Sequence, residues 1–259
     1  MTATESYQTP DGRTIGPSVM EMRNITLRFG GVTAIHDISF DIREGEIRAI
    51  IGPNGAGKSS MLNVINGFYH PQEGEILYKG EVRKPMKPYE IAYQGIARTF
   101  QNIALFKGMT TLDNIMTGRL THMKTGMLEQ IIWSGKAERE EVENRAFVER
   151  IIDFLEIQTI RKTPVGRLPY GLQKRVELGR ALAAEPSLLL LDEPMAGMGK
   201  EETFRMIEIL SLVGAEKTIL MVEHDMDAVF SLADQLSVLV NGRVIATDSV
   251  AQIRSNPEV

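Results

Sequence analysis

The chain has 259 residues, 43% of them hydrophobic, so it is long enough to bury a substantial core in one large α/β domain or in one domain with an insertion. Its formal net charge of −5, from 29 basic and 34 acidic side chains, lacks the basic excess typical of nucleic-acid-binding domains, so we expect no nucleic-acid partner. The sequence contains no cysteine, which excludes disulfides and thiolate chemistry.

Neither a membrane-spanning helix nor a secretory signal is expected. The longest apolar runs, such as SLLLL and TILMV, fall well short of the about 20 residues that a spanning helix needs. Residues 1–18 lack a basic region followed by an apolar one, and we predict that they form a flexible polar lead-in. Residues 255–259 are predicted to be a short C-terminal tail.

Strand patterns begin at Val19. The stretches VMEMRNITLRF and AIHDISFDI alternate apolar and polar residues and predict two β-strands of one sheet. A third predicted strand, EIRAII, runs into a glycine-rich stretch, and a helix is expected to start near Lys58. The order is therefore strand, glycine-rich loop, helix.

The segment from about 103 to 184 has helical patterns and is predicted to be an inserted α-helical subdomain. A short helix is expected at TTLDNIMTGR, where Thr110 and Asp113 have the spacing of a capping pair. A long amphipathic helix is expected from Glu138 to Leu155. Its predicted core stripe contains Val142, Ala146, Ile151, Ile152 and Leu155.

Strands and helices alternate again after the insertion. The predicted order is the strand SLLLLD, a helix near Lys200 to Val213, the strand TILMVEH, and a helix near Met226 to Leu232. Two short strands, QLSVLV and RVIAT, follow with a turn at Asn241-Gly242. This alternation is typical of an α/β core with a parallel sheet.

The stretch GPNGAGKSS, residues 52–60, fits the P-loop pattern of two glycines flanking four residues, followed by Lys and Ser. Glycines allow the backbone to form a concavity around a phosphate, and the N-terminus of the following helix favours an anion. Lys58 supplies a charge for the outer phosphates and Ser59 a hydroxyl for Mg²⁺. The predicted nucleotide-binding residues are Gly52, Pro53, Asn54, Gly55, Ala56, Gly57, Lys58, Ser59 and Ser60.

Two acidic residues follow the predicted strand LLLL, which is apolar enough to be buried on both faces. Asp192 and Glu193 come at its carboxyl end, where α/β sheets bind ligands. We predict that Asp192 holds Mg²⁺ through water and that Glu193 acts as the base or orienting group for a water that attacks the γ-phosphate.

Two single polar residues end other predicted strands. Gln101 ends IARTFQ and is either a ligand of Mg²⁺ or of the attacking water, or a structural residue. His224 ends TILMVEH and either contacts the γ-phosphate or serves as a capping or packing residue. In the functional interpretation the catalytic set is Glu193, His224, Gln101 and Lys58, and the Mg²⁺ ligands are Ser59, Gln101 and Asp192.

The ordered set GPNGAGKSS, TFQ, LPYGLQKR, LLLLDEP and EHD resembles the nucleotide-binding subunits of ATP-binding cassette (ABC) transporters over about residues 18–254. The resemblance implies a P-loop NTPase core with a parallel sheet, an antiparallel β subdomain and the helical insertion, in an ATPase domain at 19–254. It also implies that Gln101 is the Q-loop residue, that His224 is the switch histidine and that Phe29 stacks on adenine. The alternative for Phe29 is a core residue at a strand end.

The segments RFGGVTAIHDISF and GIARTFQNIALF are similar to segments of the subunits that power uptake of branched-chain amino acids and related hydrophobic or carboxylate solutes. That resemblance implies ATP and Mg²⁺ as cofactors, a second ATPase subunit of the same or a sister chain, membrane permease subunits, and indirectly a periplasmic solute-binding protein. The chain would then lie peripherally on the cytoplasmic face of the cell membrane. The alternatives are a lipopolysaccharide-export ATPase and a soluble cassette protein outside transport.

The resemblance also implies a signature segment that acts on nucleotide bound to the opposite subunit. That segment comprises Leu168, Pro169, Tyr170, Gly171, Leu172 and Gln173. The superfamily has Leu-Ser-Gly-Gly-Gln here, so the serine hydroxyl is replaced by Pro169, which lacks both a hydroxyl and an N–H. The expected contact that remains is Gly171 at a helix N-terminus. A second departure is Gly199, where the superfamily usually has Asp.

Overall fold

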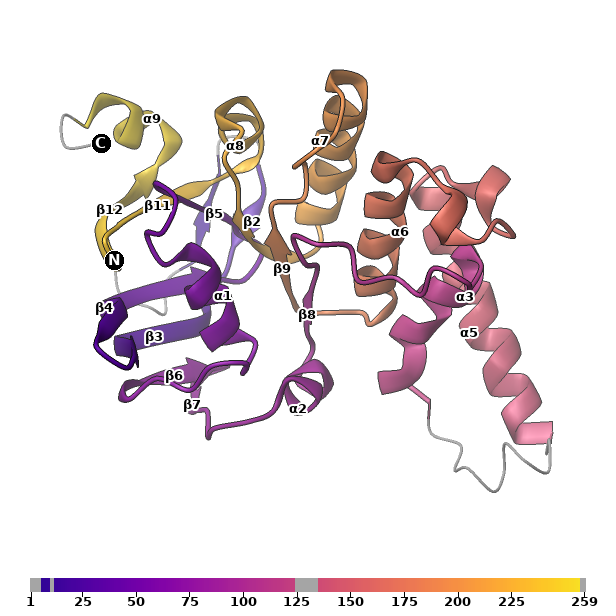
Figure 1. The fold of residues 1–259 in the computed structure, drawn as a ribbon, viewed down its shortest axis with the longest axis horizontal. Coiled ribbons are helices and arrows are strands. Elements are labelled where there is room, and N and C mark those ends of the chain that lie inside the picture. Colours follow the sequence, from indigo (N-terminus) through magenta and orange to yellow (C-terminus); the bar gives the residue numbers. More distant parts are fainter. Residues whose placement is uncertain (1–5, 10–11, 124–134, 257–259) are drawn as a thin grey trace.

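The computed structural model describes residues 6–9, 12–123 and 135–256. Within these residues the strands form a six-stranded sheet, a four-stranded sheet and a two-stranded pair (Figure 1). The strands are β1 Tyr7–Gln8, β2 Thr14–Ile15, β3 Ser18–Phe29, β4 Val32–Arg43, β5 Ile47–Ile51, β6 Glu73–Tyr78, β7 Glu81–Val82, β8 Ile96–Arg98, β9 Leu188–Asp192, β10 Thr218–Val222, β11 Gln235–Val240 and β12 Arg243–Ser249. The helices are α1 Lys58–Ile65, α2 Pro88–Tyr93, α3 Thr111–Met116, α5 Gly135–Phe154, α6 Tyr170–Ala183, α7 Lys200–Gly214, α8 Met226–Leu232 and α9 Val250–Ser255, with short 3-10 helices at Thr117–Thr121, Gln158–Ile160 and Val165–Arg167.

The six-stranded sheet has the order β12-β11-β5-β10-β9-β8. Its neighbouring strands are parallel, except for the antiparallel hairpin of β11 and β12. Every residue of β5, β9 and β10 is buried, as expected for parallel strands that are covered on both faces. The prediction of a parallel α/β core is confirmed, and the carboxyl ends of these three strands lie at one edge of the sheet.

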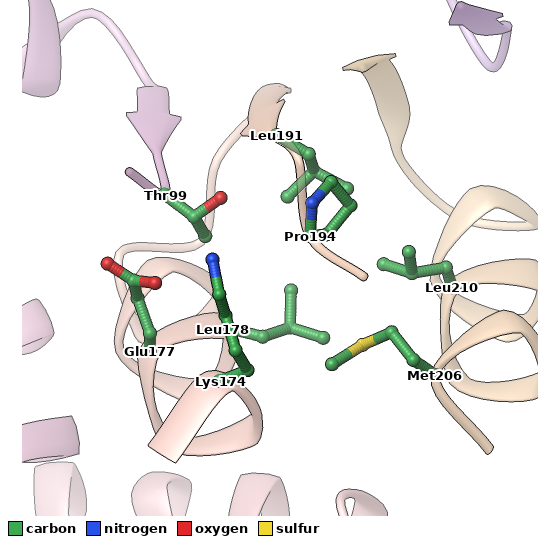
Figure 2. Close-up of a pocket in the computed structure, with 8 residues that line it drawn as sticks. All are labelled: Thr99, Lys174, Glu177, Leu178, Leu191, Pro194, Met206 and Leu210. Carbon is green, nitrogen blue, oxygen red and sulfur yellow. The ribbon is translucent and has the colours of Figure 1, made fainter. Parts of the chain in front are cut away.

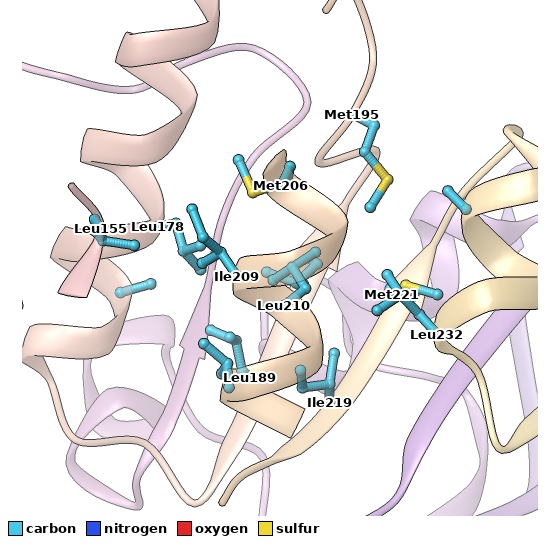
Figure 3. Packing of buried hydrophobic residues seen from close by; sticks show 14 of the residues in the cluster. Leu155, Leu178, Leu189, Met195, Met206, Ile209, Leu210, Ile219, Met221 and Leu232 are labelled. Carbon is cyan, nitrogen blue, oxygen red and sulfur yellow. The ribbon is translucent and has the colours of Figure 1, made fainter. Parts of the chain in front are cut away.

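The leucines of β9 point alternately into two hydrophobic cores. Leu189 and Leu191 belong to a core that the sheet shares with α3, α5, α6, α7 and α8 (Figure 3). Leu188 and Leu190 belong to the other core, on the opposite face. This alternation, which follows from the two-residue period of a strand, explains why four consecutive leucines are buried.

The second core is closed by α1 and by the four-stranded antiparallel sheet, whose order is β4-β3-β6-β7. Met20, Met22 and Ile25 of β3 meet Met61 and Leu62 of α1 in this core. The predicted pairing of the first two long strands in one sheet is therefore confirmed. The helix that follows the P-loop lies between the two sheets.

The insertion is helical, and its α3 begins with the predicted cap, in which Thr110 Oγ1 accepts a hydrogen bond from the Asp113 N–H at 3.1 Å. The long helix α5 begins three residues before the predicted start, and part of its predicted core stripe is wrong. Val142 and Ala146 are exposed, because they lie on the helix face opposite to the buried Val148 and Ile152.

A polar residue occupies the buried stripe of α5 instead. Asn144 is buried, and its Oδ1 accepts a hydrogen bond from Arg119 Nε at 2.8 Å. Hydrophobic periodicity could not predict this position, because Asn144 is polar and gains its partner only in the folded subdomain. Among the described residues, no helix combines the length and apolar character that a membrane span requires.

Part of the segment that the sequence predicts to be a flexible lead-in is folded onto the domain. β1 and β2 pair with each other, and the side chain of Ile15 is fully buried. Arg13 Nη2 lies 2.5 Å from Asp234 Oδ1, at the start of β11. The ion pair and the burial of Ile15 give these residues a fixed position that their local composition does not indicate.

Candidate functional site

The loop between β5 and α1 has a backbone that only glycine adopts readily. Gly52, Gly55 and Gly57 have φ angles of 149°, 81° and 104°. Close packing adds a second requirement, because a Cβ atom on Gly52 would lie 2.0 Å from the carbonyl oxygen of Leu239. The β11–β12 turn braces the loop from the same side, where the Gly242 N–H donates to the Ala56 carbonyl at 2.9 Å. The loop shape is therefore set by the fold itself.

Lys58 closes this loop from inside. Its side chain is buried, and Nζ donates to the carbonyl oxygens of Gly52 at 2.7 Å and of Pro53 at 2.9 Å. Burial lowers the pKa of Lys58, and the negative charges of Glu193 and Asp192 oppose this shift. The predicted P-loop cation and the predicted acidic pair thus belong to one electrostatic site.

Asp192 ends β9, as the sequence predicts, and it is buried. Its main partner is a residue that the sequence did not indicate. Arg98 Nη2 donates to Asp192 Oδ2 at 2.8 Å, and Arg98 Nη1 donates to Asn63 Oδ1 of α1 at 2.6 Å. The guanidinium of β8 therefore connects the end of β9 to the P-loop helix. The only available signal was an arginine inside the predicted strand IARTFQ.

The three polar residues that the sequence places at separate strand ends meet at Glu193. Gln101 Nε2 donates to Glu193 Oε2 at 2.8 Å, and His224 Nε2 lies 3.3 Å from Glu193 Oε1. The backbone of Glu193 has φ of 49°, which is uncommon for a residue other than glycine and is often found at functional sites. One carboxylate is therefore held between two side chains from distant strands.

Glu223 supports this arrangement and was also missed. It is buried, its Oε1 accepts from the Met195 N–H at 2.8 Å, and its Oε2 accepts from the His224 N–H at 2.8 Å. The carboxylate thereby fixes the loop after Glu193 relative to the loop that carries His224. An acidic residue at the end of the apolar run TILMV was the available signal.

The residues predicted to hold Mg²⁺ fit that ion. Asp192 Oδ1 is buried without a hydrogen-bond partner, although its other oxygen is paired with Arg98. An uncompensated carboxylate oxygen is suited to a metal-bound water, and Ser59 is exposed in the first turn of α1. No cluster of three or more His, Cys, Asp or Glu side chains suited to a metal occurs in the described part of the chain. A hydroxyl, an amide and phosphate oxygens would therefore have to complete the coordination.

Phe29 is not a core residue, so that alternative is wrong. It ends β3 with 45% of its surface exposed, and its ring centroid lies 4.9 Å from that of Tyr69 at an interplanar angle of 75°. An exposed aromatic pair offers faces on which a planar base can stack. Contact with adenine stays a prediction, to which Tyr69 is added.

The signature segment lies away from the P-loop. α6 begins at Tyr170, with Pro169 at its N-cap and no side-chain cap. Figure 1 shows α1 and α6 on opposite sides of β8 and β9. The structure therefore does not bring residues 168–173 together with the nucleotide-binding residues of the same chain.

The glycines of the signature and of the following loop have structural partners. A Cβ atom on Gly171 would lie 2.2 Å from Glu202 Oε1, so the Glu202 side chain of α7 lies directly against the start of α6. Glu202 Oε2 also accepts from the Gly199 N–H at 3.1 Å, which caps α7. The position usually occupied by Asp in the superfamily is here a helix cap that relies on a neighbouring carboxylate.

The parallel sheet, the P-loop, the acidic pair and the remote signature helix define an ATP-binding cassette. The family profile described as ABC transporter matches residues 35–196. The chain is 34% identical over 93% of its length to the high-affinity branched-chain amino acid transport ATP-binding protein BraF of Pseudomonas aeruginosa, of which it covers 95%. It is 31% identical, with the same two coverages, to the corresponding LivG protein of Escherichia coli K12.

Solved structures agree with these relatives. A nucleotide-free ATP-binding cassette from an ABC transporter superposes with a TM-score of 0.81 at 31% identity, over 93% of this chain and 97% of that one. An ADP-bound cassette gives a TM-score of 0.80 at 32% identity, over 93% and 96%. The chain belongs to the ABC transporter family.

Proposed function

We propose that this chain is the ATP-hydrolysing subunit of an importer for branched-chain amino acids or related hydrophobic or carboxylate solutes. The observation that carries the proposal is the convergence of Gln101 and His224 on Glu193, beside a P-loop closed by Lys58. Support for the solute class comes from the relatives, which are named as branched-chain amino acid transport ATP-binding proteins.

Each residue has a task in hydrolysis. The loop 52–57 and the N-terminus of α1 bind the phosphates, and Lys58 turns from its loop carbonyls to the outer phosphates. Ser59, Gln101 and Asp192 would hold Mg²⁺, which would supply neutralisation of the phosphate charge when bound. Glu193 orients and polarises the attacking water, and His224 contacts the γ-phosphate. The chemistry needs little beyond positioning and charge neutralisation.

Complete sites require a second subunit, because the signature helix lies on the other side of the sheet from the P-loop (Figure 1). We infer that two cassettes, either two copies of this chain or this chain and a sister chain, enclose two Mg-ATP molecules. Hydrolysis then opens the pair. In this arrangement Gly171 and the N-terminus of α6 face the partner's γ-phosphate, without the hydroxyl that Pro169 lacks.

Membrane permease subunits dock on a groove beside the Q-loop segment. The groove has a volume of about 360 Å³, and its lining includes Phe100, Phe106 and Leu120. Phe106 and Leu120 are 56% and 60% exposed, which is typical of a surface that a partner covers. The groove is suited to an amphipathic helix from a permease, which would place this chain on the cytoplasmic face of the membrane. A solute-binding protein acts on it only through the permease.

The alternatives differ in the partners they bind. A lipopolysaccharide-export ATPase would co-purify with export subunits, and the ATPase activity of a soluble cassette would be stimulated by RNA or DNA. The test measures uptake of radiolabelled leucine, isoleucine and valine by cells from which the gene for this chain has been deleted. Phosphate release by the purified protein is measured in parallel. We expect uptake to fail and to be restored by the wild type but not by Glu193→Gln. Normal uptake of all three amino acids, with ATP hydrolysis intact, would exclude branched-chain amino acids as the solutes.

A further inference from the structure

One face of the signature helix α6 is occupied by three charged residues that all contact the Q-loop segment 99–104. Lys174, Glu177 and Arg180 are spaced three residues apart, so they lie along the same side of the helix. Lys174 and Glu177 are 3% and 1% exposed. Charged side chains are buried in this way only when other groups compensate them, so their contacts define what this face does.

Lys174 joins three functional segments through one ammonium group. Its Nζ donates to the carbonyl oxygens of Phe100 at 3.3 Å, of Gln101 at 3.1 Å and of Glu193 at 3.4 Å. Two of these carbonyls belong to the Q-loop segment, and the third belongs to the residue that follows β9. The three donors of a lysine ammonium are thus all used on backbone atoms of the catalytic site.

Glu177 and Arg180 extend the connection to the end of the same segment. Glu177 Oε1 accepts from the N–H groups of Phe100 at 3.3 Å and Ala104 at 3.4 Å, and Arg180 Nη1 donates to the Ala104 carbonyl at 2.5 Å. The backbone from 100 to 104 is therefore bound to α6 by both donors and acceptors. It cannot shift independently of the helix without breaking several of these bonds.

The surroundings of Lys174 leave its ammonium almost no access to water. Figure 2 shows its ammonium beside Thr99 and Glu177, at a cavity of about 10 Å³ whose other walls include Leu191 and Met206. That volume is at the lower limit for a single water. Burial lowers the pKa of Lys174 and raises that of Glu177, and the opposite charge of each counteracts the shift of the other. Their charges offset each other in part, and Arg180 Nη2 adds to the compensation at 3.9 Å from Glu177 Oε1, whereas Glu177 Oε2 has no hydrogen-bond partner.

We propose that Lys174 is a positioning residue for ATP hydrolysis, which makes Gln101 and Glu193 move together with the signature helix of their own chain. The inference rests on the proposed function. When the start of α6 engages nucleotide on a partner cassette, the carbonyls of Gln101 and Glu193 follow through Lys174. Chemistry at the chain's own P-loop then depends on whether its signature helix is engaged.

The test separates positioning from simple anchoring of the fold. Lys174→Met keeps the approximate volume of the side chain but removes the largest opposing charge near the buried Glu177 carboxylate, which retains Arg180 Nη2 at 3.9 Å. The double variant Lys174→Met/Glu177→Gln removes both charges, so it is expected to fold. Lys162→Met is the matched control, because Lys162 is an exposed lysine of the same helical subdomain.

For the double variant we expect kcat for Mg-ATP to fall about 10- to 100-fold, the range expected when catalytic groups are misplaced, while the Kd for ATP stays within about twofold of wild type. Lys162→Met should match wild type in both. A folded double variant with wild-type kcat would overturn the proposal, and so would equal losses of ATP binding and turnover. Absence of hydrolysis by the wild-type protein would instead count against the proposed function.

A second measurement needs no substitution at Lys174. Amide hydrogen exchange of the Glu193→Gln protein should show that residues 99–104 and the first turns of α6 gain protection together when ATP is added. Protection of α6 without any change at 99–104 would show that the two segments move separately. It would contradict the proposal that Lys174 couples them.

Discussion

Gln101 Nε2 lies 2.8 Å from Glu193 Oε2, although the two residues are 92 positions apart in the chain. The amide of the Q-loop therefore occupies one oxygen of the carboxylate that we assign to the attacking water, and His224 lies at the other oxygen. Each of these oxygens can still accept a second hydrogen bond, so a water can bind to Glu193 beside the two contacts.

Glu193→Gln should separate binding from hydrolysis. Glutamine keeps the shape of the side chain but cannot accept a proton, so we expect ATP binding to persist and kcat to fall by about 10²- to 10⁴-fold. Bound ATP should then accumulate in a closed dimer. Phosphate release and light scattering with ATP measure the two effects. Unreduced phosphate release would remove Glu193 from the catalytic set, and a monomer at all ATP concentrations would require a different partner chain.

Lys58→Ala should abolish ATP binding at ordinary concentrations. The change removes a charge-assisted contact to phosphate, worth roughly 2 kcal/mol or about 30-fold in affinity, and it also breaks the two bonds that close the loop. We therefore expect a loss above that figure in calorimetric titration with Mg-ATP. Wild-type affinity in a folded Lys58→Ala protein would refute the P-loop assignment.

Gly52→Ala should damage the site through the backbone alone. Its Cβ would meet the Leu239 carbonyl oxygen, and its φ of 149° is unfavourable for alanine. Strain of about 1–3 kcal/mol should lower both the unfolding midpoint and the affinity for ATP. Gly108→Ala is the control, because nothing lies within 4 Å of its added Cβ. Equal effects of the two substitutions on ATP affinity would contradict a P-loop shaped by Gly52.

Most of the fold and the residues of the site could be predicted because local patterns encode them. Strands such as LLLLD are buried on both faces, and the glycines of the P-loop carry backbone requirements that are visible in the sequence. The predictions that failed concern side chains whose burial depends on tertiary partners. Asn144 lies in a buried stripe only because Arg119 reaches it, and the exposed Val142 fits an apolar period that does not match the buried face.

Supporting residues of the site were missed for the same reason. Arg98, Glu223 and Lys174 make their decisive contacts with segments that are remote in the chain. A charged residue in a strand or helix pattern is ordinarily placed in solvent, and only the folded structure shows that its partners are buried with it. Conversely, the resemblance to ABC cassettes predicted one shared site for Gln101, Glu193 and His224, and the structure brings their side chains together.

Pro169→Ser tests whether the signature acts on a partner's nucleotide. Pro169 is the N-cap of α6 and makes no side-chain cap, so serine adds a hydroxyl at the helix start without removing a capping hydrogen bond. A serine cap contributes about 0.5–1 kcal/mol, but loss of the fixed φ of proline costs a similar amount, so the free energy of unfolding should change little. If the hydroxyl also reaches the γ-phosphate of a second subunit, one hydrogen bond of about 0.5–1.5 kcal/mol should tighten the ATP-dependent dimer by roughly 2- to 10-fold.

The dimer is best measured in the Glu193→Gln background, where ATP is not consumed. Pro164→Ser, at the N-cap of the 3-10 helix Val165–Arg167, is the matched control and should leave the dimer unchanged. A tighter dimer with an unaltered Kd of the monomer for ATP would support action on the partner's nucleotide, whereas tighter ATP binding by the monomer would place the signature at its own chain's site.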